Sequence, residues 1–393
     1  MKKRILAAIM AAAMAFSLAA CGSTDTSSDS STAETSSAEE TTEEASSGEA
    51  SFTIGYPTSS SYNAVMSAMH ENRIAVAEAA GGELITEIFD FTADGTVTAV
   101  EKLIQQGCDG VYVTPVADSI LPTIVNMCEE AGVYFVLSMR SISDEDVKAV
   151  VEASEYYVGD VYEDEYSAGY AMGKALYEAG GTTYAIISTQ EGDTTGSLRE
   201  EGLAAAAEEF GLEQVAEYRN PSQASDSAEA VESFIASYPD LDGIIRLGTN
   251  ATGDVTAICT ALENAGKAGE IAFITVDTEE GCDEYLENGT ITCTLRDLLV
   301  QDSIAASILL VNAIQGNTLE GDKEVVLSYS EVTDSEELAL YYEYIACEDP
   351  VYSAEEIQEN FLISAGASLT IEDVSDMANS MTATSVMERK TSE

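Results

Sequence analysis

Short apolar runs alternate with longer amphipathic stretches from Phe52 onward, which predicts alternating strands and helices. In the first amphipathic stretch, Val97, Val100, Leu103 and Ile104 recur at the spacing that places them on one helix face. The apolar runs, each expected to form a strand, begin near Phe52, Leu84, Gly110, Tyr134, Thr183, Gln214, Gly243, Ile271 and Thr290. The expected helices cover Thr96–Gln106, Ile120–Ala131, Ser167–Ala179, Leu198–Phe210, Ser227–Ser237 and Val255–Ala265.

The spacing of these units predicts the fold class. A strand and its helix take roughly 25–30 residues, which suits right-handed crossovers between parallel strands. The stretch from Phe52 onward is longer than one hydrophobic core usually serves, so we expect two lobes that meet near Ser154–Gly159. The predicted class is α/β, with two doubly wound parallel-sheet lobes. Ligands bind beyond the carboxyl ends of such strands, so two facing lobes would form a cleft that closes by hinging.

The first residues predict export from the cytoplasm. Lys2, Lys3 and Arg4 precede an apolar run, Ile5–Ala20, which is too short for a spanning helix of about 20 residues. We interpret residues 1–20 as a signal peptide rather than a transmembrane anchor. The ending Leu18–Gly22 resembles the bacterial lipobox, and this resemblance implies that Cys21 carries lipid and that the protein is anchored to the cell membrane outside the cytoplasm.

Residues 21–51 follow as the lipidated cysteine and a linker rich in Ser, Thr and Glu. The linker has no large apolar side chain before residue 52, so it cannot bury enough surface to offset the entropy of ordering. We expect it to be disordered.

The charge balance excludes two classes of partner. The chain carries a formal charge of −55, and removing the three basic residues of the signal peptide leaves 13 basic against 71 acidic side chains, or −58. Nucleic acids and anionic membrane surfaces both require clustered Lys and Arg, so neither is an expected partner.

The cysteines other than Cys21 are expected to be free buried thiols, although a protein outside the cytoplasm could also form one disulfide bond. They are Cys108, Cys128, Cys259, Cys282, Cys293 and Cys347.

Catalytic signatures are missing from the sequence. His70 is the single histidine, so no HExxH zinc site exists, and we interpret it as a packing or surface residue. The nucleophile elbow, the phosphate-binding loop and the dinucleotide fingerprint are also absent. We therefore expect no enzyme activity, no cofactor and no metal.

The stretch from Phe52 to Gly316 resembles the periplasmic sugar-binding proteins of the ribose-binding type, which are type I solute receptors of ABC importers. The order and spacing of several segments carry this resemblance. They are Gln105–Val116 (QQGCDGVYVTPV), Ala131–Arg140 (AGVYFVLSMR), Tyr157–Leu176 (YVGDVYEDEYSAGYAMGKAL), Leu198–Gly211 (LREEGLAAAAEEFG), Ala272–Thr278 (AFITVDT) and Asn288–Asp297 (NGTITCTLRD).

The resemblance implies discontinuous lobes joined by a three-segment hinge. Lobe one would comprise residues 52–155 plus 298–320, and lobe two residues 156–297 plus 323–345. Residues 346–393 have no counterpart and form a C-terminal extension. Within it we expect a helix in Asp349–Leu362, capped by Ser353 with Glu356 at the third position, and a loose tail from Thr382.

The resemblance also implies a set of ligand residues. In lobe one they are Tyr62 and Asn63, in the loop after the first strand, and Met139-Arg140, where the family has Asp-Arg. In lobe two they are Arg199, Asn250, Asp277 and Asp297, the last replacing a glutamine of the family. Buried Arg and Asp satisfy sugar hydroxyls, which both donate and accept hydrogen bonds. The lost carboxylate at Met139, and an aromatic residue missing near Pro221–Gln223, argue against a simple pentose or hexose.

The sequence thus predicts a lipid-anchored, monomeric solute receptor that hands a small polar ligand, with carbohydrate as the favoured class, to an ABC importer permease. Other functions stay open at this stage. The same fold could sense a ligand and signal to a membrane partner, or bind a non-sugar solute such as a nucleoside or an autoinducer. An extracytoplasmic hydrolase and a structural surface protein are less favoured.

Overall fold

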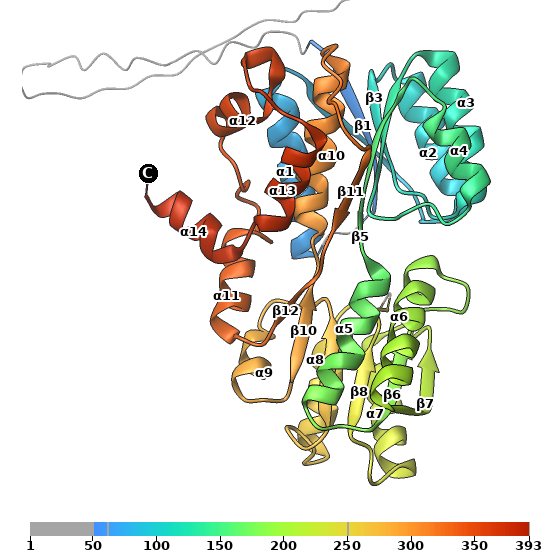
Figure 1. The fold of residues 1–393 in the computed structure, drawn as a ribbon, viewed down its shortest axis with the longest axis vertical. Coiled ribbons are helices and arrows are strands. Elements are labelled where there is room, and N and C mark those ends of the chain that lie inside the picture. The colour runs from blue at the N-terminus through green and yellow to red at the C-terminus, as the bar shows by residue number, and fades with distance from the viewer. Residues whose placement is uncertain (1–50, 61–62, 250, 393) are drawn as a thin grey trace, which may run out of the picture. The chain divides into compact units, whose positions relative to one another are not determined.

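A computed structural model describes residues 51–60, 63–249 and 251–392 of the chain. Its strands form two six-stranded sheets, which are the centres of the two lobes (Figure 1). Residues 49–393 form one compact unit. The predicted fold class, two doubly wound parallel-sheet lobes, is confirmed.

The first sheet has the order β11-β5-β4-β3-β1-β2, and all of its pairings are parallel. Its central strands β3 and β4 are buried apolar runs, as expected when helices cover both faces of a parallel sheet. The strand bounds are β1 Thr53–Thr58, β2 Glu83–Ile88, β3 Gly110–Val113, β4 Tyr134–Ser138, β5 Tyr157–Glu163 and β11 Glu324–Leu327.

The second sheet repeats this arrangement in the order β12-β10-β9-β8-β6-β7. Its pairings are parallel except that β12 runs antiparallel to β10. The strand bounds are β6 Thr183–Ser188, β7 Glu213–Arg219, β8 Gly243–Arg246, β9 Ala272–Val276, β10 Cys293–Arg296 and β12 Ser330–Val332.

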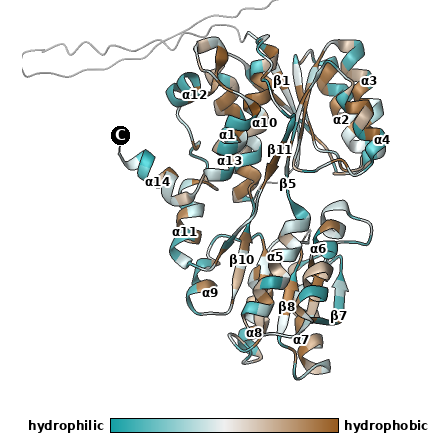
Figure 2. Ribbon diagram, viewed as in Figure 1, coloured by the Kyte–Doolittle hydropathy of each residue, from teal (hydrophilic) through white to brown (hydrophobic). Residues whose placement is uncertain are grey.

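Helices cover both faces of each sheet. In lobe one, α1 and α10 pack together on one face while α2, α3 and α4 lie on the other (Figure 1). Nearly every residue of α10 is buried, and Figure 2 shows it as a largely brown helix. The bounds are α1 Ala64–Ala79, α2 Ala93–Gln105, α3 Leu121–Ala131, α4 Glu145–Glu152 and α10 Leu299–Ile314.

The closest helix packing in lobe two joins α5 and α6, and glycine makes it possible. A side chain at Gly169 would place its Cβ 1.8 Å from the carbonyl oxygen of Arg199, and one at Gly202 would lie 1.9 Å from that of Tyr166. This contact fixes α6, and with it Arg199, against the start of α5. The bounds are α5 Glu165–Glu178, α6 Thr194–Phe210, α7 Ala224–Ser237, α8 Asp254–Asn264, α9 Asp283–Glu287 and α11 Ser335–Tyr344.

The expected lobe boundaries need correction. β5 is a strand of the first sheet, so lobe one continues to Glu163 instead of ending at residue 155. β11 also belongs to the first sheet, so the return to lobe two begins after Leu327 instead of at residue 323. Both strands lie next to a crossing between the lobes, and their sequences alone do not say which sheet they join. The crossings β5–α5, β10–α10 and β11–β12 make the three-segment hinge.

The C-terminal extension packs on both lobes. Its helix α12 (Ala354–Phe361) lies on α1, and α13 (Ile371–Ser380) lies on α10 and β11. The predicted cap is confirmed, because Ser353 and Glu356 form a capping box. The expectation of a loose tail is wrong: α14 (Ala383–Thr391) packs on α11 of lobe two and buries its apolar side chains. The extension therefore adds two crossings between the lobes, one before α12 and one after α13.

Two further findings bear on the sequence predictions. All six cysteines from Cys108 to Cys347 are free thiols, and five of them are buried. Among the described residues, no helix has the length and apolarity needed to cross a membrane.

Candidate ligand-binding site

In lobe one, the turn after β4 has an unusual and well-anchored backbone. Met139 directly follows the strand and takes a left-handed conformation, with φ of 76°. Its N–H donates to Asp302 Oδ2 at 2.8 Å and to the carbonyl of Val161 at 3.0 Å. The Ser138 hydroxyl donates to the other oxygen of Asp302. A residue other than glycine rarely adopts this backbone conformation without such support. The turn therefore holds Arg140, the next residue, in a fixed position.

Arg140 links the two lobes. Its Nη2 lies 3.7 Å from Oδ2 of Asp193, and 27% of the arginine side chain is exposed. Asp193 caps α6 by accepting from the backbone N–H of Gly196 at 2.9 Å. An ion pair this long and this exposed contributes little to stability, so the guanidinium is available to a ligand.

A buried arginine contacts the residues that hold this turn. The guanidinium of Arg73 lies between the rings of Tyr56 and Tyr112, 4.1 and 4.6 Å from their centroids. It donates to Ser138 Oγ at 2.9 Å and lies 3.9 Å from Asp302. Burial raises the pKa of the Asp302 carboxyl to about 6, against the opposing effect of Arg73. The Arg73–Asp302 pair thus anchors the turn that carries Met139 and Arg140.

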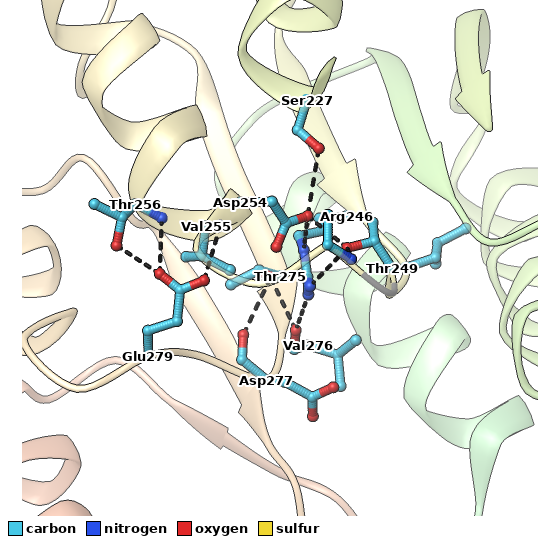
Figure 3. Close-up of polar contacts among 12 residues, drawn as sticks. Ser227, Arg246, Thr249, Asp254, Val255, Thr256, Thr275, Val276, Asp277 and Glu279 are labelled. Carbon is cyan, nitrogen blue, oxygen red and sulfur yellow. Dashed lines mark hydrogen bonds and ion pairs between the residues drawn. The ribbon is translucent and has the colours of Figure 1, made fainter. Parts of the chain in front are cut away.

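In lobe two, a second buried arginine anchors the turn after β9. Arg246, the last residue of β8, donates to Asp254 Oδ2 at 2.8 Å and to the carbonyl of Val276 at 2.7 Å (Figure 3). It also donates to Thr249 Oγ1 at 3.2 Å, and that hydroxyl donates to the same Asp254 oxygen. These contacts tie the ends of β8 and β9 to the first residue of α8.

Asp277 directly follows β9 and takes a left-handed conformation, with φ of 59°. Its loop is held by Glu279, which accepts from Val255 N–H and from the backbone and hydroxyl of Thr256. Figure 3 shows the Asp277 carboxylate pointing away from Arg246 and Asp254. Among the described residues this carboxylate has no hydrogen-bond or ion-pair partner, and the side chain is half-buried. A fixed and unpaired acceptor is what a ligand donor requires.

A network of buried acids joins the three hinge segments. Glu163, at the end of β5, accepts from Leu298 N–H at 2.5 Å and from the Tyr329 hydroxyl at 2.9 Å. The same hydroxyl lies 3.3 Å from Glu165 Oε2. Burial, and then the neighbouring charge of Glu165, raises the pKa of Glu163 well above its ordinary value.

Arg199 is the cation of this network. Its Nε donates to Glu165 at 2.6 Å, Nη1 to the carbonyl of Leu247 at 2.8 Å and Nη2 to Tyr329 at 2.8 Å. The side chain is buried, and each of its three nitrogens has a protein partner. Asp297 is also buried, and its Oδ1 accepts from the hydroxyl of Tyr341 at 2.9 Å. Burial, followed by the charge of Asp277, raises the pKa of Asp297 to about 7.

A cavity of about 430 Å³ is lined in part by Glu280, in the loop that follows Asp277. Its wall from lobe one is the start of α1, where Asn63 caps the helix by accepting from the N–H of Met66 at 2.8 Å. Glu280 of lobe two and Tyr342, at the end of α11, line the opposite side. The cavity therefore brings residues of both lobes to one space.

The predicted residues fall into three groups. Tyr62, Asn250 and the lipidation site Cys21 lie outside the described residues. Asn63, Met139, Arg140 and Asp277 lie at the loops just described and keep accessible polar groups or surface. Arg199 and Asp297 lie at the hinge, bonded to protein groups. No set of three or more His, Cys, Asp or Glu side chains in the described part of the chain is arranged to hold a metal ion.

Sequence reasoning missed the anchors. Arg246 ends an apolar strand, and a basic residue there is the signal that could have identified it. Arg73 lies on a helix without a clear apolar stripe, so nothing local marks it as buried. Tyr329 lies in a crossing between the lobes, and only the folded chain brings it to Glu163.

Comparison with known proteins places the chain among binding proteins. The family model described as "periplasmic binding protein domain" matches residues 54–317. Comparison with curated proteins gives no significant sequence match.

Many solved structures share the fold. An ABC transporter solute-binding protein from Actinobacillus succinogenes, with bound D-allose, is 22% identical, with a TM-score of 0.62 over 72% of this chain and 98% of its own. One from Bacillus halodurans, with bound myo-inositol, is 19% identical, with a TM-score of 0.62 over 75% and 99%. One from Agrobacterium vitis, bound with α-D-tagatopyranose, is 17% identical, with a TM-score of 0.61 over 73% and 96%.

Proposed function

Because the chain belongs to the periplasmic binding protein domain family, we propose that it is an extracytoplasmic receptor that binds a small polar solute between its lobes and delivers it to an ABC importer permease. The match covers residues 54–317, and the two doubly wound lobes with three hinge crossings support this function. The receptor binds reversibly and catalyses no reaction. The signal peptide of residues 1–20, lipidation at Cys21 and the monomeric state are parts of the same proposal.

Carbohydrate is the proposed ligand class. The observation that carries it is the Asp277 carboxylate, which is fixed in its turn and has no partner among the described residues. A carboxylate accepts from two adjacent hydroxyls, and Arg140 supplies donors from lobe one. The D-allose, myo-inositol and tagatopyranose named for the structural neighbours are polyhydroxylated solutes that this combination of groups suits.

The side chains divide into ligand contacts and hinge supports. We assign ligand contacts to Asn63, Met139, Arg140 and Asp277, together with Tyr62 and Asn250. Arg199 and Asp297 act through the hinge, where their bonds hold the crossing segments in register. A ligand that bonds Arg140 and Asp277 together draws lobe one toward lobe two, which is the hinge closure that a permease would recognise.

The test is a thermal unfolding screen against monosaccharides, disaccharides, polyols, nucleosides and amino acids. A ligand at a hundred times its dissociation constant should stabilise the protein by about 2.7 kcal/mol. A shift with sugars that is lost in Asp277→Ala, but kept in the exposed control Glu287→Gln, would support the proposal. A shift with nucleosides or amino acids alone would keep the receptor and overturn the carbohydrate. No shift with any class would contradict the proposed function.

A further inference from the structure

The cavity lined by Glu280 has walls from three segments of the chain. The start of α1 contributes Asn63 and Ser67, and the loop after β9 contributes Glu280. The end of α11 and the turn that follows contribute Tyr342 and Glu348. The Tyr342 hydroxyl lies 3.0 Å from Oγ1 of Thr278, the residue after Asp277, so two cavity residues, Tyr342 and Glu280, contact or belong to the loop that carries Asp277.

One wall of this cavity lies beyond the residues that the family model matches. The family model ends at residue 317, whereas Tyr342 and Glu348 lie beyond it. Tyr342 comes from α11 of lobe two, and Glu348 comes from the C-terminal extension. The wall therefore combines a lobe-two helix with the extension.

Hydrogen bonds and an ion pair hold the turn that carries this wall. Val351, just beyond it, is buried and donates its N–H to the side-chain oxygen of Asn72 on α1 at 2.9 Å. Arg389 of α14 donates to the carbonyl of Val351 at 2.6 Å. Lys390 lies 2.7 Å from the Asp349 carboxylate. These bonds tie the turn after α11 to both α1 and α14, so the cavity wall does not depend on a bound molecule.

The lining of the cavity suits a neutral polyhydroxylated group. Glu280 and Glu348 are exposed, and neither carboxylate has a hydrogen-bond or ion-pair partner among the described residues. The Asn63 side chain uses its oxygen to cap α1, and its NH₂ group has no hydrogen-bond partner among the described residues. Tyr342 offers an aromatic ring, a surface on which the apolar face of a sugar packs. None of the described residues that line the cavity is Lys or Arg, so an anionic group would be disfavoured.

We propose that this cavity is a subsite for a second sugar ring, so that the ligand is a disaccharide or a longer neutral saccharide rather than a monosaccharide. This inference rests on the proposed function. The first ring lies between Arg140 and Asp277, and the second reaches past Thr278 to Tyr342 and Glu348. The cavity volume of about 430 Å³ falls within the range of small-molecule sites.

Calorimetric titration of the full-length chain, in a detergent without a sugar headgroup, tests this subsite. The probes are D-glucose, D-galactose, D-mannose and D-xylose, each paired with its β-1,4-linked disaccharide. We expect one disaccharide to bind at least about tenfold more tightly than its monosaccharide, since one charge-assisted hydrogen bond supplies that factor. Glu348→Ala and Tyr342→Ala should each reduce this preference to about twofold or less. In Glu348→Ala the affinity for the monosaccharide should stay unchanged. Glu343→Ala, exposed on the same helix but outside the cavity, is the matched control and should keep the preference.

The outcomes separate the subsite from the receptor. A monosaccharide that binds as tightly as its disaccharide, or a disaccharide preference that survives both cavity variants, would overturn the subsite and leave the receptor function standing. If no sugar of the panel binds, the proposed function and the subsite fail together. Loss of both sugars in Asp277→Ala, with loss of the disaccharide preference alone in Glu348→Ala, would establish two distinct parts of one site.

Discussion

The two lobes use the same backbone device to present opposite charges. Their sheets have matching strand orders, in which β4 of lobe one corresponds to β9 of lobe two. Met139 follows β4 and Asp277 follows β9, and both take left-handed conformations that L-residues rarely adopt. Such a conformation persists only where surrounding contacts fix it, and it is concentrated at functional sites.

The residues that fix the two turns have opposite charges. In lobe one the acid Asp302 binds the turn, and the base Arg140 is presented. In lobe two the base Arg246 binds the turn, and the acid Asp277 is presented. Each anchor is one half of a buried pair, Arg73–Asp302 or Arg246–Asp254. The comparison teaches that buried charges near the site serve as anchors, whereas the accessible charges on the anchored turns are the groups that we propose as ligand contacts.

The largest expected effect concerns the anchors. Arg246→Leu should lower the free energy of unfolding by about 3–5 kcal/mol, because it leaves Asp254 buried without its cation. Arg73→Leu should cost less, because Arg73 makes one hydrogen bond to a side chain and lies 3.9 Å from Asp302. Urea unfolding followed by circular dichroism measures both. A larger loss for Arg73→Leu would contradict the proposed ranking of the two anchors.

The next effect concerns the presented groups. Arg140→Ala and Asp277→Ala should each weaken sugar binding by roughly 10- to 100-fold, the loss expected for a charge-assisted hydrogen bond. Their stability without ligand should change by less than about 1 kcal/mol, because the Arg140 pair is long and partly exposed and the Asp277 carboxylate has no partner among the described residues. Calorimetric titration with the sugar found by the screen gives the affinities. Unchanged affinity in both variants would remove these residues from the site.

The anchor of lobe one and the hinge should also make stability depend on pH. The pKa of Asp302 is raised to about 6 and that of Asp297 to about 7, both chiefly by burial. The folded protein therefore keeps protons that the unfolded chain releases above about pH 4, and the free energy of unfolding should fall as pH rises from about 4 to 7.

Asp302→Asn should flatten part of this decline, because its amide does not titrate. Thermal unfolding at half-unit pH steps measures the effect, with exposed Glu287→Gln as the control. A melting temperature that rises between pH 4 and 7 by the same amount in the native chain and in Asp302→Asn would show that this carboxyl does not titrate as described.

The smallest effect concerns the backbone of the two turns. Met139→Gly should stabilise the protein by up to about 1 kcal/mol, because glycine adopts a φ of 76° without strain. Asp277→Gly should gain less, since aspartate tolerates the left-handed region better than methionine does. Chemical unfolding of both variants gives the comparison. Destabilisation by Met139→Gly would mean that the methionine side chain contributes more than its backbone costs.

Most strands of the fold could be predicted from the sequence, because they are continuous apolar runs. The runs near Gly110, Tyr134 and Gly243 are β3, β4 and β8, each buried on both faces. β11 and β12 are short and carry charged residues, so their runs are too weak to detect. β5 is not among the predicted strands, because the expected lobe break at Ser154–Gly159 overlaps its first residues, and its sheet depends on pairing with β4, which no local pattern encodes.

The site is less predictable for a physical reason. Arg140 and Arg199 look alike in the sequence, as scarce basic residues beside predicted sheet ends. The folded chain separates them, because the partners of Arg199 come from Glu165, Leu247 and Tyr329. Whether a charged side chain bonds to protein groups or is left accessible to a ligand depends on such long-range partners. Periodicity and spacing carry no information about them.

The central claim is that one ligand bridges Arg140 of lobe one and Asp277 of lobe two and thereby closes the hinge. Small-angle X-ray scattering of residues 49–393, with and without the sugar found by the screen, tests it most directly. The radius of gyration should decrease when the sugar saturates the native protein and should stay constant in Asp277→Ala at the same sugar concentration. Sugar binding to the native protein with no change in the radius of gyration would contradict the account.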